Sequence, residues 1–544
     1  MKRLKPLTLT FVFVLTIFFG VIAQNCDDKE KEGPEGPDGP DVPGDKYTIT
    51  VTGGTSSKTQ AVFRDVITLT AGTQEGKEFS DWTITPSNVT MLSGNSFIMP
   101  QSNVTVTGNF SEYDPTAKRP YFITNNYGEN SASELLVQWQ NASTVTTQTL
   151  QIVKATGSFT TPDVEKTATG KLFSHANESP LYIGTFEARN VFKAEAAGLA
   201  PNTLYKYRMG TEGAWSKPFY HQTSRGSAAN FSFTVVADPQ AAVHTNMERT
   251  LKAANTYDPD NRFFLMLGDI VNEIGKRPDE IVSYTNTANE FNIERPIIAT
   301  QGNHDTYRTT PGTDNQYVFG EATVFNAFVT FPDNGWDTDA NKANRSQSYY
   351  FYYNKVLVVV LNTMSTQSAT GTATPVHTAQ ATWLKNLLEA DKAGNLSNYR
   401  IVVTHVSPFG GRTSERWLQP EVRAAYGKIF TDYKVDIVFG GHDHVYGRSN
   451  PITIGTSTGL SSLNFAGTAG GTVYSIAGAT GPKFYTLDPD ANRDAYFPYR
   501  LQLPDNNSEG FYVNVKVTSG KLTVTAIRAD TGAVVDQYDV QIKN

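Results

Sequence analysis

From residue 231 onward, five short apolar runs are each followed by polar residues of the types that bind metals. The last run, Val435–Phe439, leads into Gly441-His442-Asp443-His444. Two imidazoles one residue apart at the end of a buried strand are difficult to explain as packing. The other four runs lead, in chain order, into Asp238-Pro239-Gln240, Gly268-Asp269, Gly302-Asn303-His304-Asp305 and His405. In open α/β sheets, ligands bind beyond the carboxyl ends of the strands, where all five motifs are expected to lie.

Each motif alone has an ordinary structural explanation. A Gly-Asp pair after a strand is usually a turn, and an Asn-His pair is usually part of a loop. His405 alone is consistent with a hydrogen-bonded core histidine. Because the five motifs occur in order, with His-x-His last, together they favour one metal site.

The pattern along the chain predicts a multidomain protein with N-terminal all-β modules and an α/β domain. From about residue 229, strand, loop and helix patterns follow one another, with an apolar face in the third helix. Helices are predicted near residues 244–254, 279–292, 377–391 and 415–433. Strand patterns precede this region and return in residues 481–544.

Bulk properties exclude some classes of protein. A chain of 544 residues predicts three or four domains. The net charge of −7 and the pI of about 5.7 do not suit a nucleic-acid-binding protein, which needs a basic surface to contact phosphates.

Residues 1–25 predict an export signal, because Lys2, Arg3 and Lys5 precede an apolar stretch, Leu7–Ala23. Cys26, the only cysteine, indicates a lipidated N-terminus that attaches the protein to the outer membrane or cell surface. Gln24-Asn25 departs from the usual small residues of a lipoprotein cleavage site. Ordinary cleavage after Ala23, giving a periplasmic or secreted protein, therefore remains an alternative.

The segments that follow predict a linker and two β modules. Residues 26–46 are acidic and rich in Pro and Gly, which predicts an extended tether. Residues 47–112 resemble an InlB-type B repeat through Phe79-Ser80-Asp81-Trp82 and Phe97-Ile98-Met99-Pro100. Residues 116–226 resemble a fibronectin type III-like sandwich, with an early buried tryptophan, Trp139, and a tyrosine corner at Leu199–Tyr205.

The polar motifs resemble the calcineurin-like metallophosphoesterases over residues 229–480. The preceding sandwich and the closing segment 481–544 resemble those of purple acid phosphatases in domain architecture. The resemblance implies a four-layer α/β/β/α catalytic sandwich that residues 481–544 complete.

The resemblance also implies two metal ions bridged by Asp269. Asp238 and His444 would complete one ligand set, and Asn303, His405 and His442 the other. Carboxylate, amide and imidazole ligands suit two divalent or mixed-valence ions of Fe, Zn or Mn.

Two positions depart from the family patterns. Gln240 stands where many members have histidine, and its carbonyl is predicted to ligate a metal instead. Asn272 stands where purple acid phosphatases have a tyrosine ligand. The iron-to-phenolate colour is therefore not expected, and the metals remain open.

The catalytic candidates are His304, Asp305 and Arg412. The resemblance implies that His304 protonates the leaving group or binds the phosphate, with a purely orienting role as the alternative. Asp305 is predicted to fix the tautomer of His304, and Arg412 is either a phosphate clamp or a solvent-facing arginine. Tyr446 and Arg448 are interpreted as supports of the histidine loop. His244 and His377 are predicted to be surface residues at helix ends.

These features predict an exported, metal-dependent phosphoric ester hydrolase. Its substrate would be a small phosphate monoester, attacked in line by a metal-bridging hydroxide. The alternatives are a phosphodiesterase on the same site and a cell-surface binding protein with a vestigial phosphoesterase fold. The sequence does not define the physiological substrate or the oligomeric state.

Overall fold

The computed structural model describes residues 45–92, 95–112, 114, 116–174, 187–274, 278–292, 295–308, 317–318, 322–336, 348–365, 375–412, 418–465, 467–487, 497–502 and 510–542. The predicted export signal, Cys26 and the linker up to residue 44 lie outside these residues. Within the described part of the chain, no helix has the length and apolarity needed to cross a membrane.

The first β module consists of two small sheets, with strand orders β3-β1-β8-β5 and β2-β4-β7-β6. Alternation positions its core: in β4 (Val66–Ala71), Ile67 and Leu69 are buried, whereas their neighbours Val66 and Thr68 are exposed. The remaining strands are β1 (Tyr47–Thr52), β2 (Gly54–Ser56), β3 (Gln60–Ala61), β5 (Lys77–Thr85), β6 (Thr90–Leu92), β7 (Ser96–Ile98) and β8 (Val104–Glu112).

The second module is a sandwich of sheets ordered β13-β14-β10-β9 and β12-β11-β15-β16. The predicted core tryptophan, Trp139, is fully buried and stacks on Phe192, with 5.6 Å between ring centroids. The tyrosine corner is present, because the Ala200 N–H donates to the Tyr205 hydroxyl at 2.9 Å. The strands are β9 (Tyr121–Tyr127), β10 (Leu135–Ala142), β11 (Thr147–Lys154), β12 (Val164–Thr169), β13 (Lys171–Phe173), β14 (Arg189–Ala196), β15 (Leu204–Gly210) and β16 (Phe219–Gln222).

The α/β domain is built on two sheets. The first has the order β19-β18-β17-β29-β30-β31. Its strands are β17 (Phe231–Val236), β18 (Asn261–Met266), β19 (Ile297–Ala299), β29 (Phe511–Val517), β30 (Lys521–Arg528) and β31 (Val534–Gln541). The last three come from the C-terminal segment, and β29 pairs antiparallel with β17. The C-terminal segment therefore extends the sheet that carries the first polar motif.

The second sheet has the order β22-β23-β24-β25-β27-β26-β28. Its strands β23, β24, β25 and β27 are parallel. The bounds are β22 (Tyr349–Tyr353), β23 (Val356–Leu361), β24 (Tyr399–Thr404), β25 (Ile437–Gly440), β26 (Tyr446–Arg448), β27 (Val473–Ala477) and β28 (Tyr499–Leu501). A pair of two-residue strands, β20 (Tyr307–Arg308) and β21 (Tyr317–Val318), lies outside both sheets.

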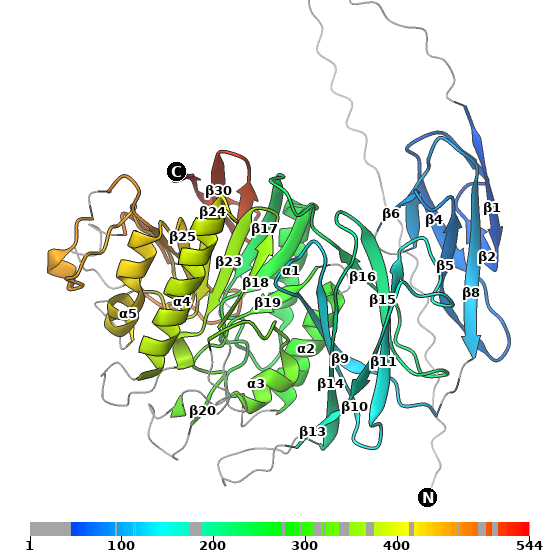
Figure 1. Ribbon diagram of the computed structural model, residues 1–544, viewed down its shortest axis with the longest axis horizontal. Helices are drawn as coiled ribbons and strands as arrows, with labels where there is room; N and C mark the ends of the chain where they lie inside the picture. The colour runs from blue at the N-terminus through cyan, green and yellow to red at the C-terminus, as the bar shows by residue number, and fades with distance from the viewer. Residues whose placement is uncertain are drawn as a thin grey trace, which may run out of the picture. The chain divides into compact units, whose positions relative to one another are not determined.

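Helices cover the outer faces of the two sheets. The helices are α1 (Thr245–Tyr257), α2 (Pro278–Asn292), α3 (Thr323–Phe328), α4 (Pro375–Gly394) and α5 (Gln419–Asp432), with 3₁₀ turns at Thr363–Ser365 and Leu460–Ser462. Figure 1 shows α4 and α5 lying along the strands β23–β25. The bounds of α1, α2, α4 and α5 agree with the four helices predicted from sequence, whereas the short helix α3 was not predicted.

Strand β23 shows how the layers pack. Val356, Val358 and Val360 belong to the core that also contains Phe233 of β17. The alternate residues of β23 pack instead with Leu384 of α4. One face of the second sheet therefore packs on the first sheet and the other on helices, which gives the predicted α/β/β/α arrangement.

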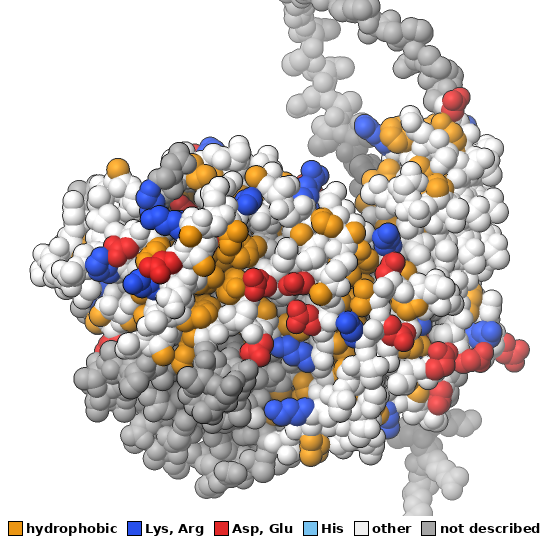
Figure 2. Space-filling view, viewed as in Figure 1, with side chains coloured by type: hydrophobic (Ala, Val, Ile, Leu, Met, Phe, Trp, Pro, Cys, Tyr) orange, Lys and Arg blue, Asp and Glu red, His pale blue; other side chains and the backbone are white. Residues whose placement is uncertain are grey.

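Exposed charges on the helices form pairs of opposite sign. Lys385 and Glu389 of α4, and Lys428 and Asp432 of α5, are i,i+4 ion pairs. Figure 2 shows acidic and basic side chains interspersed on the face in view. Such exposed pairs contribute little to stability, so the domain depends on its apolar layers.

Candidate metal centre

The backbone at the carboxyl ends of the strands has an unusual conformation. Asp238, Asp269, His442 and His444 have φ angles of 48°, 51°, 70° and 49°. L-residues rarely adopt this left-handed region, and strained residues of this kind concentrate at functional sites. The local strain therefore marks the same positions that the polar motifs marked in the sequence.

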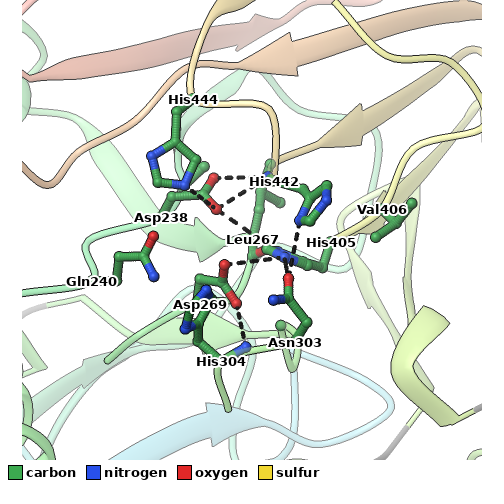
Figure 3. A network of polar contacts seen from close by, with 12 residues as sticks. Asp238, Gln240, Leu267, Asp269, Asn303, His304, His405, Val406, His442 and His444 are labelled. Atoms are coloured by element: carbon green, nitrogen blue, oxygen red, sulfur yellow. Dashed lines mark hydrogen bonds and ion pairs between the residues drawn. The ribbon is translucent and has the colours of Figure 1, made fainter. Parts of the chain in front are cut away.

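Two groups of ligand atoms share one aspartate. Asp238, Asp269 and His444 offer atoms that all lie within 4.8 Å of one another, and so do Asp269, His405 and His442. Nε2 of His444 lies 3.4 Å from Oδ1 of Asp238, and Nε2 of His405 lies 3.4 Å from Oδ2 of Asp269. Figure 3 shows these side chains converging from different loops.

Asn303 completes the second group through its amide oxygen. Oδ1 of Asn303 lies 3.0 Å from Nε2 of His405 and 3.0 Å from Nδ1 of His442. The three side chains therefore direct one oxygen and two ring nitrogens at a common point (Figure 3).

The tautomers of two histidines are fixed by backbone carbonyls. Nδ1 of His405 donates to the carbonyl of Leu267 at 2.8 Å, and Nδ1 of His444 donates to that of Lys483 at 2.6 Å. In the neutral ring, Nε2 then carries a lone pair that faces the site. Carboxylate, amide and imidazole lone pairs that converge in this way suit a cation, so this donor set fits two metal ions.

The electrostatics of the site follow from burial and proximity. Burial opposes ionisation of Asp269, but the rings of His405 and His304 outweigh it and hold the pKa of that carboxyl far below its ordinary value. Burial likewise acts to lower the pKa of His405, but Asp269 and Asp238 raise it to about 9. Asp269 therefore remains anionic at neutral pH.

Glycines make room for the bridging carboxylate. A Cβ at Gly302 would lie 2.2 Å from Oδ1 of Asp269. A Cβ at Gly441 would lie 2.6 Å from Oδ2 of Asp238. Both distances are shorter than van der Waals contact, so a side chain at either position would displace a ligand.

His304 is oriented by a backbone carbonyl, and not by Asp305 as predicted. Nδ1 of His304 lies 2.5 Å from the carbonyl oxygen of Asn272, and its backbone N–H donates to Asp269 at 2.8 Å. The carboxylate of Asp305 instead accepts the N–H groups of Ile270 at 2.9 Å and Gly302 at 2.8 Å. Burial, reinforced by the charge of Asp269, raises the pKa of Asp305 to about 8. Asp305 thus ties two ligand loops together instead of holding a proton of His304.

Gln240 also differs from its predicted role as a metal ligand. Its carbonyl oxygen accepts a hydrogen bond from Nζ of Lys483 at 3.2 Å. Turning the amide over would bring its NH₂ group against the ammonium group, donor against donor. The amide NH₂ of Gln240 is buried, and no hydrogen-bond partner for it lies among the described residues.

Arg412 is held at the rim of the site. Its guanidinium carbon lies 4.2 Å from the centroid of the Tyr485 ring, and Nε donates to the Thr486 carbonyl at 3.4 Å. The Tyr485 ring in turn lies 4.4 Å from the ring of His444. Arg412 is therefore connected to the metal centre through one aromatic ring.

The supporting roles of Tyr446 and Arg448 have a structural basis, because both side chains bind Asp536 of the C-terminal segment, at 2.9 and 2.6 Å. His244 is not the surface residue that was predicted: it is 1% exposed. Its Nε2 lies 2.8 Å from the carbonyl of Ile270, and its ring packs against Tyr284 of α2. The side chain of His377 lies outside the described residues.

Several residues of the site have no signal in the sequence. Leu267 and Asn272 act through backbone carbonyls, which any residue type supplies. Lys483 and Tyr485 lie in Gly481–Leu487, after the last polar motif, where no pattern of metal ligands marks them. Asp443 lies between the two histidines of the last motif, but its own role was not predicted: its carboxylate accepts the backbone N–H groups of Gly411 and Arg412.

Comparison with known proteins agrees with this architecture. Residues 231–446 match the calcineurin-like phosphoesterase family, residues 120–223 the purple acid phosphatase N-terminal domain, and residues 47–114 the divergent InlB B-repeat domain. The fold and site thus define a metallophosphoesterase domain. The chain joins it to a domain that matches the N-terminal domain of purple acid phosphatases. The predicted resemblances to calcineurin-like metallophosphoesterases, to purple acid phosphatases in domain architecture and to the InlB-type B repeat are therefore confirmed.

Individual relatives are more distant. An Arabidopsis thaliana Fe(3+)-Zn(2+) purple acid phosphatase is 28% identical over 260 residues, covering 46% of this chain and 50% of the relative. A purple acid phosphatase of Glycine max is 25% identical over 302 residues, covering 54% of this chain and 58% of the relative. The chain therefore spans about half the length of the curated relatives it matches.

A solved structure shows the same fold. The purple acid phosphatase from yellow lupin seeds superposes with a TM-score of 0.60 at 14% identity, covering 91% of this chain and 96% of that protein.

Proposed function

We propose that this protein is an exported hydrolase of phosphate esters, with monoesters as its main substrates, that works with two bound metal ions. The observation that carries the proposal is the pair of three-residue ligand groups sharing Asp269. Two bound cations of Fe, Zn or Mn would supply Lewis acidity and lower the pKa of a water molecule.

The residues of the chain divide the remaining work. Asp238 and His444 would hold one ion, and Asn303, His405 and His442 the other, with Asp269 between them. The carbonyls of Leu267 and Lys483 orient two of the imidazoles, so a productive geometry exists before substrate arrives.

His304 is the proposed proton donor to the leaving group. Its Nδ1 is engaged by the Asn272 carbonyl. Nε2 is then the atom that carries the transferable proton when the ring is charged. A fixed ring can hold that proton at one point, as protonation of a leaving alkoxide requires.

The proposal is tested by metal quantification and a substrate panel. Purified protein should bind two ions per chain and release phosphate from p-nitrophenyl phosphate faster than from bis(p-nitrophenyl) phosphate. The opposite preference would favour the phosphodiesterase alternative. Asp269→Asn should abolish both metal binding and turnover, whereas Asp260→Asn, on the surface beyond α1, should change neither.

A vestigial fold makes a different prediction: no bound metal and no turnover. The strained backbone at Asp238, Asp269, His442 and His444 argues against it. Such strain costs roughly 1 kcal/mol or more per residue. A chain that no longer used the site would gain stability by losing it.

Export and lipid attachment belong to the same proposal. They are supported by the apolar stretch and Cys26 of the sequence. Membrane fractionation and labelling with a fatty-acid analogue would test them, with Cys26→Ser as the comparison. Label on the wild type alone supports attachment, and label on neither supports release.

A further inference from the structure

A group of hydrogen-bond donors lies beside the Asp238–His444 half of the metal centre. Lys483, whose carbonyl orients His444, is half-buried. Its ammonium group donates to Gln240 and lies 5.3 Å from the centroid of the Tyr485 ring. The side chain of Lys483 is therefore held at the rim of the site.

Arg412 contacts the same aromatic ring from another loop. Its guanidinium carbon lies 4.2 Å from the Tyr485 centroid. Arginine and lysine near one ring are each attracted to its π-face. The side chains of Arg412 and Lys483 therefore both lie near the Tyr485 ring, which itself lies next to His444.

The buried amide of Gln240 adds a third donor. Gln240 is 1% exposed, and its NH₂ group finds no hydrogen-bond partner among the described residues. Figure 3 shows this amide beside Asp238 and Asp269. A buried donor without a partner is destabilising, so its position points to an acceptor supplied by a ligand.

Within the described part of the chain, the side chains of Lys483 and Arg412 contact neutral groups: the Gln240 amide, the Thr486 carbonyl and the Tyr485 ring. Half-buried cations with neutral partners attract anions, and guanidinium and ammonium groups bind phosphate and carboxylate oxygens best. The donors near His444 thus fit an anion, whereas the carboxylate, amide and imidazole acceptors of the metal centre fit metals.

We propose that Lys483, Arg412 and Gln240 form an anion subsite that binds a second anionic group of the substrate, beyond the phosphate that is hydrolysed. The proposal rests on the proposed function and narrows its substrate class. The preferred substrates are phosphomonoesters that carry a further phosphate or a carboxylate on the leaving part.

Matched substrate pairs test the subsite. 3-Phosphoglycerate differs from glycerol 3-phosphate by its carboxylate, and fructose 1,6-bisphosphate differs from fructose 6-phosphate by its second phosphate. In at least one pair, we expect kcat/KM to be about 10-fold higher for the compound with the second anionic group, which is the effect of one charge-assisted contact. A preference in the first pair alone identifies a carboxylate, and in the second alone a phosphate.

Variants assign the preference to the subsite. Lys483→Met keeps the approximate length of the side chain and removes its charge. It should raise the KM of the compound with the second anionic group, and so reduce the ratio of kcat/KM within the pair about 10-fold. Lys483→Arg should restore part of it. Lys392→Met, at an exposed position of α4, is the matched control. Thermal unfolding and metal content should be the same in all variants.

The results separate this proposal from the proposed function. Two results would overturn the subsite while leaving the phosphatase intact. One is equal kcat/KM within both pairs. The other is an equal loss in Lys483→Met for the compounds with and without the second anionic group. If neither these four compounds nor p-nitrophenyl phosphate is hydrolysed, the phosphatase assignment fails. Calorimetry with the same compounds then decides the subsite, because inert compounds bind without turnover. Tighter binding of an anionic member that is lost in Lys483→Met supports it, and equal binding overturns it.

Discussion

Asp443 holds the loop that carries Arg412. Its Oδ2 accepts the N–H of Gly411 at 2.6 Å and that of Arg412 at 3.3 Å. Because Asp443 stands between His442 and His444, one short segment carries two candidate metal ligands and also holds the backbone at Arg412.

Asp443→Ala should therefore displace Arg412 without removing a metal ligand. Each lost hydrogen bond to a carboxylate contributes about 1.5–3 kcal/mol, so we expect a lower unfolding temperature and a rise in KM of about 10-fold. Asp443→Asn, which keeps an acceptor, should restore much of KM. Steady-state kinetics and metal content measure these effects, and metal loss comparable to that of His444→Ala would contradict the assigned role.

Asn303→Ala should weaken the second metal. Its amide oxygen is shared by His405 and His442, so its loss leaves two imidazoles without their common partner. We expect occupancy to fall from two ions toward about one, and turnover to fall by about two orders of magnitude or more. Mass spectrometric metal analysis checks this, with Asn286→Ala on exposed α2 as control. Full occupancy by two ions with near-normal turnover would show that Asn303 is no ligand.

His304→Ala should affect substrates according to their leaving groups. A proton donor matters most for alkoxides, because a nitrophenolate leaves without protonation. We expect kcat for glycerol 3-phosphate to fall about 100-fold or more, and that for p-nitrophenyl phosphate to fall much less. Equal losses would exclude proton donation and leave His304 as a phosphate-binding or orienting residue.

Iron-loaded protein should not be purple. Asn272 replaces the tyrosine expected at this position, and its side chain and N–H both bind Glu280, at 3.3 and 2.8 Å. No phenolate is thus supplied from this position. Visible absorption of the iron-reconstituted protein tests this prediction. An intense iron–phenolate charge-transfer band in the visible range would show that another tyrosine binds the iron.

The sequence predicted the site because its signals are local. Each ligand directly follows an apolar run, and parallel strands bring their carboxyl ends to one edge. The bounds of α1, α2, α4 and α5 were predictable for the same reason, since periodicity is a property of short segments. That residues 481–544 complete the domain was an expectation from the resemblance to purple acid phosphatases.

The contacts that orient the ligands were not predictable. The carbonyls of Leu267, Asn272 and Lys483 leave no trace in residue type. The direction of the Gln240 amide depends on Lys483, which lies 243 positions away. His244 precedes a helix and so resembles a surface residue, but packing of α2 over α1 buries it.

A buried histidine of the sandwich should make stability depend on pH. His221, in β16, is 1% exposed, and neither ring nitrogen has a hydrogen-bond partner among the described residues. Burial lowers its pKa to about 3, from an ordinary value of 6.5. Below pH 6.5 the unfolded chain binds a proton that the folded ring excludes. The contribution of the neutral ring is therefore complete above pH 6.5 and is lost progressively as the pH falls toward 3.

His221→Phe should flatten this part of the stability profile. Phenylalanine has a similar volume, has no proton to bind, and can pack on Tyr127, whose ring centroid lies 5.5 Å from that of His221. The slope removed is about 1.4 kcal/mol per pH unit between pH 6 and pH 4. Urea denaturation across this range, followed by intrinsic tryptophan fluorescence and compared between the wild type and His221→Phe, measures it. An unchanged slope would mean that the unfolded state does not protonate His221 more readily than the folded sandwich does.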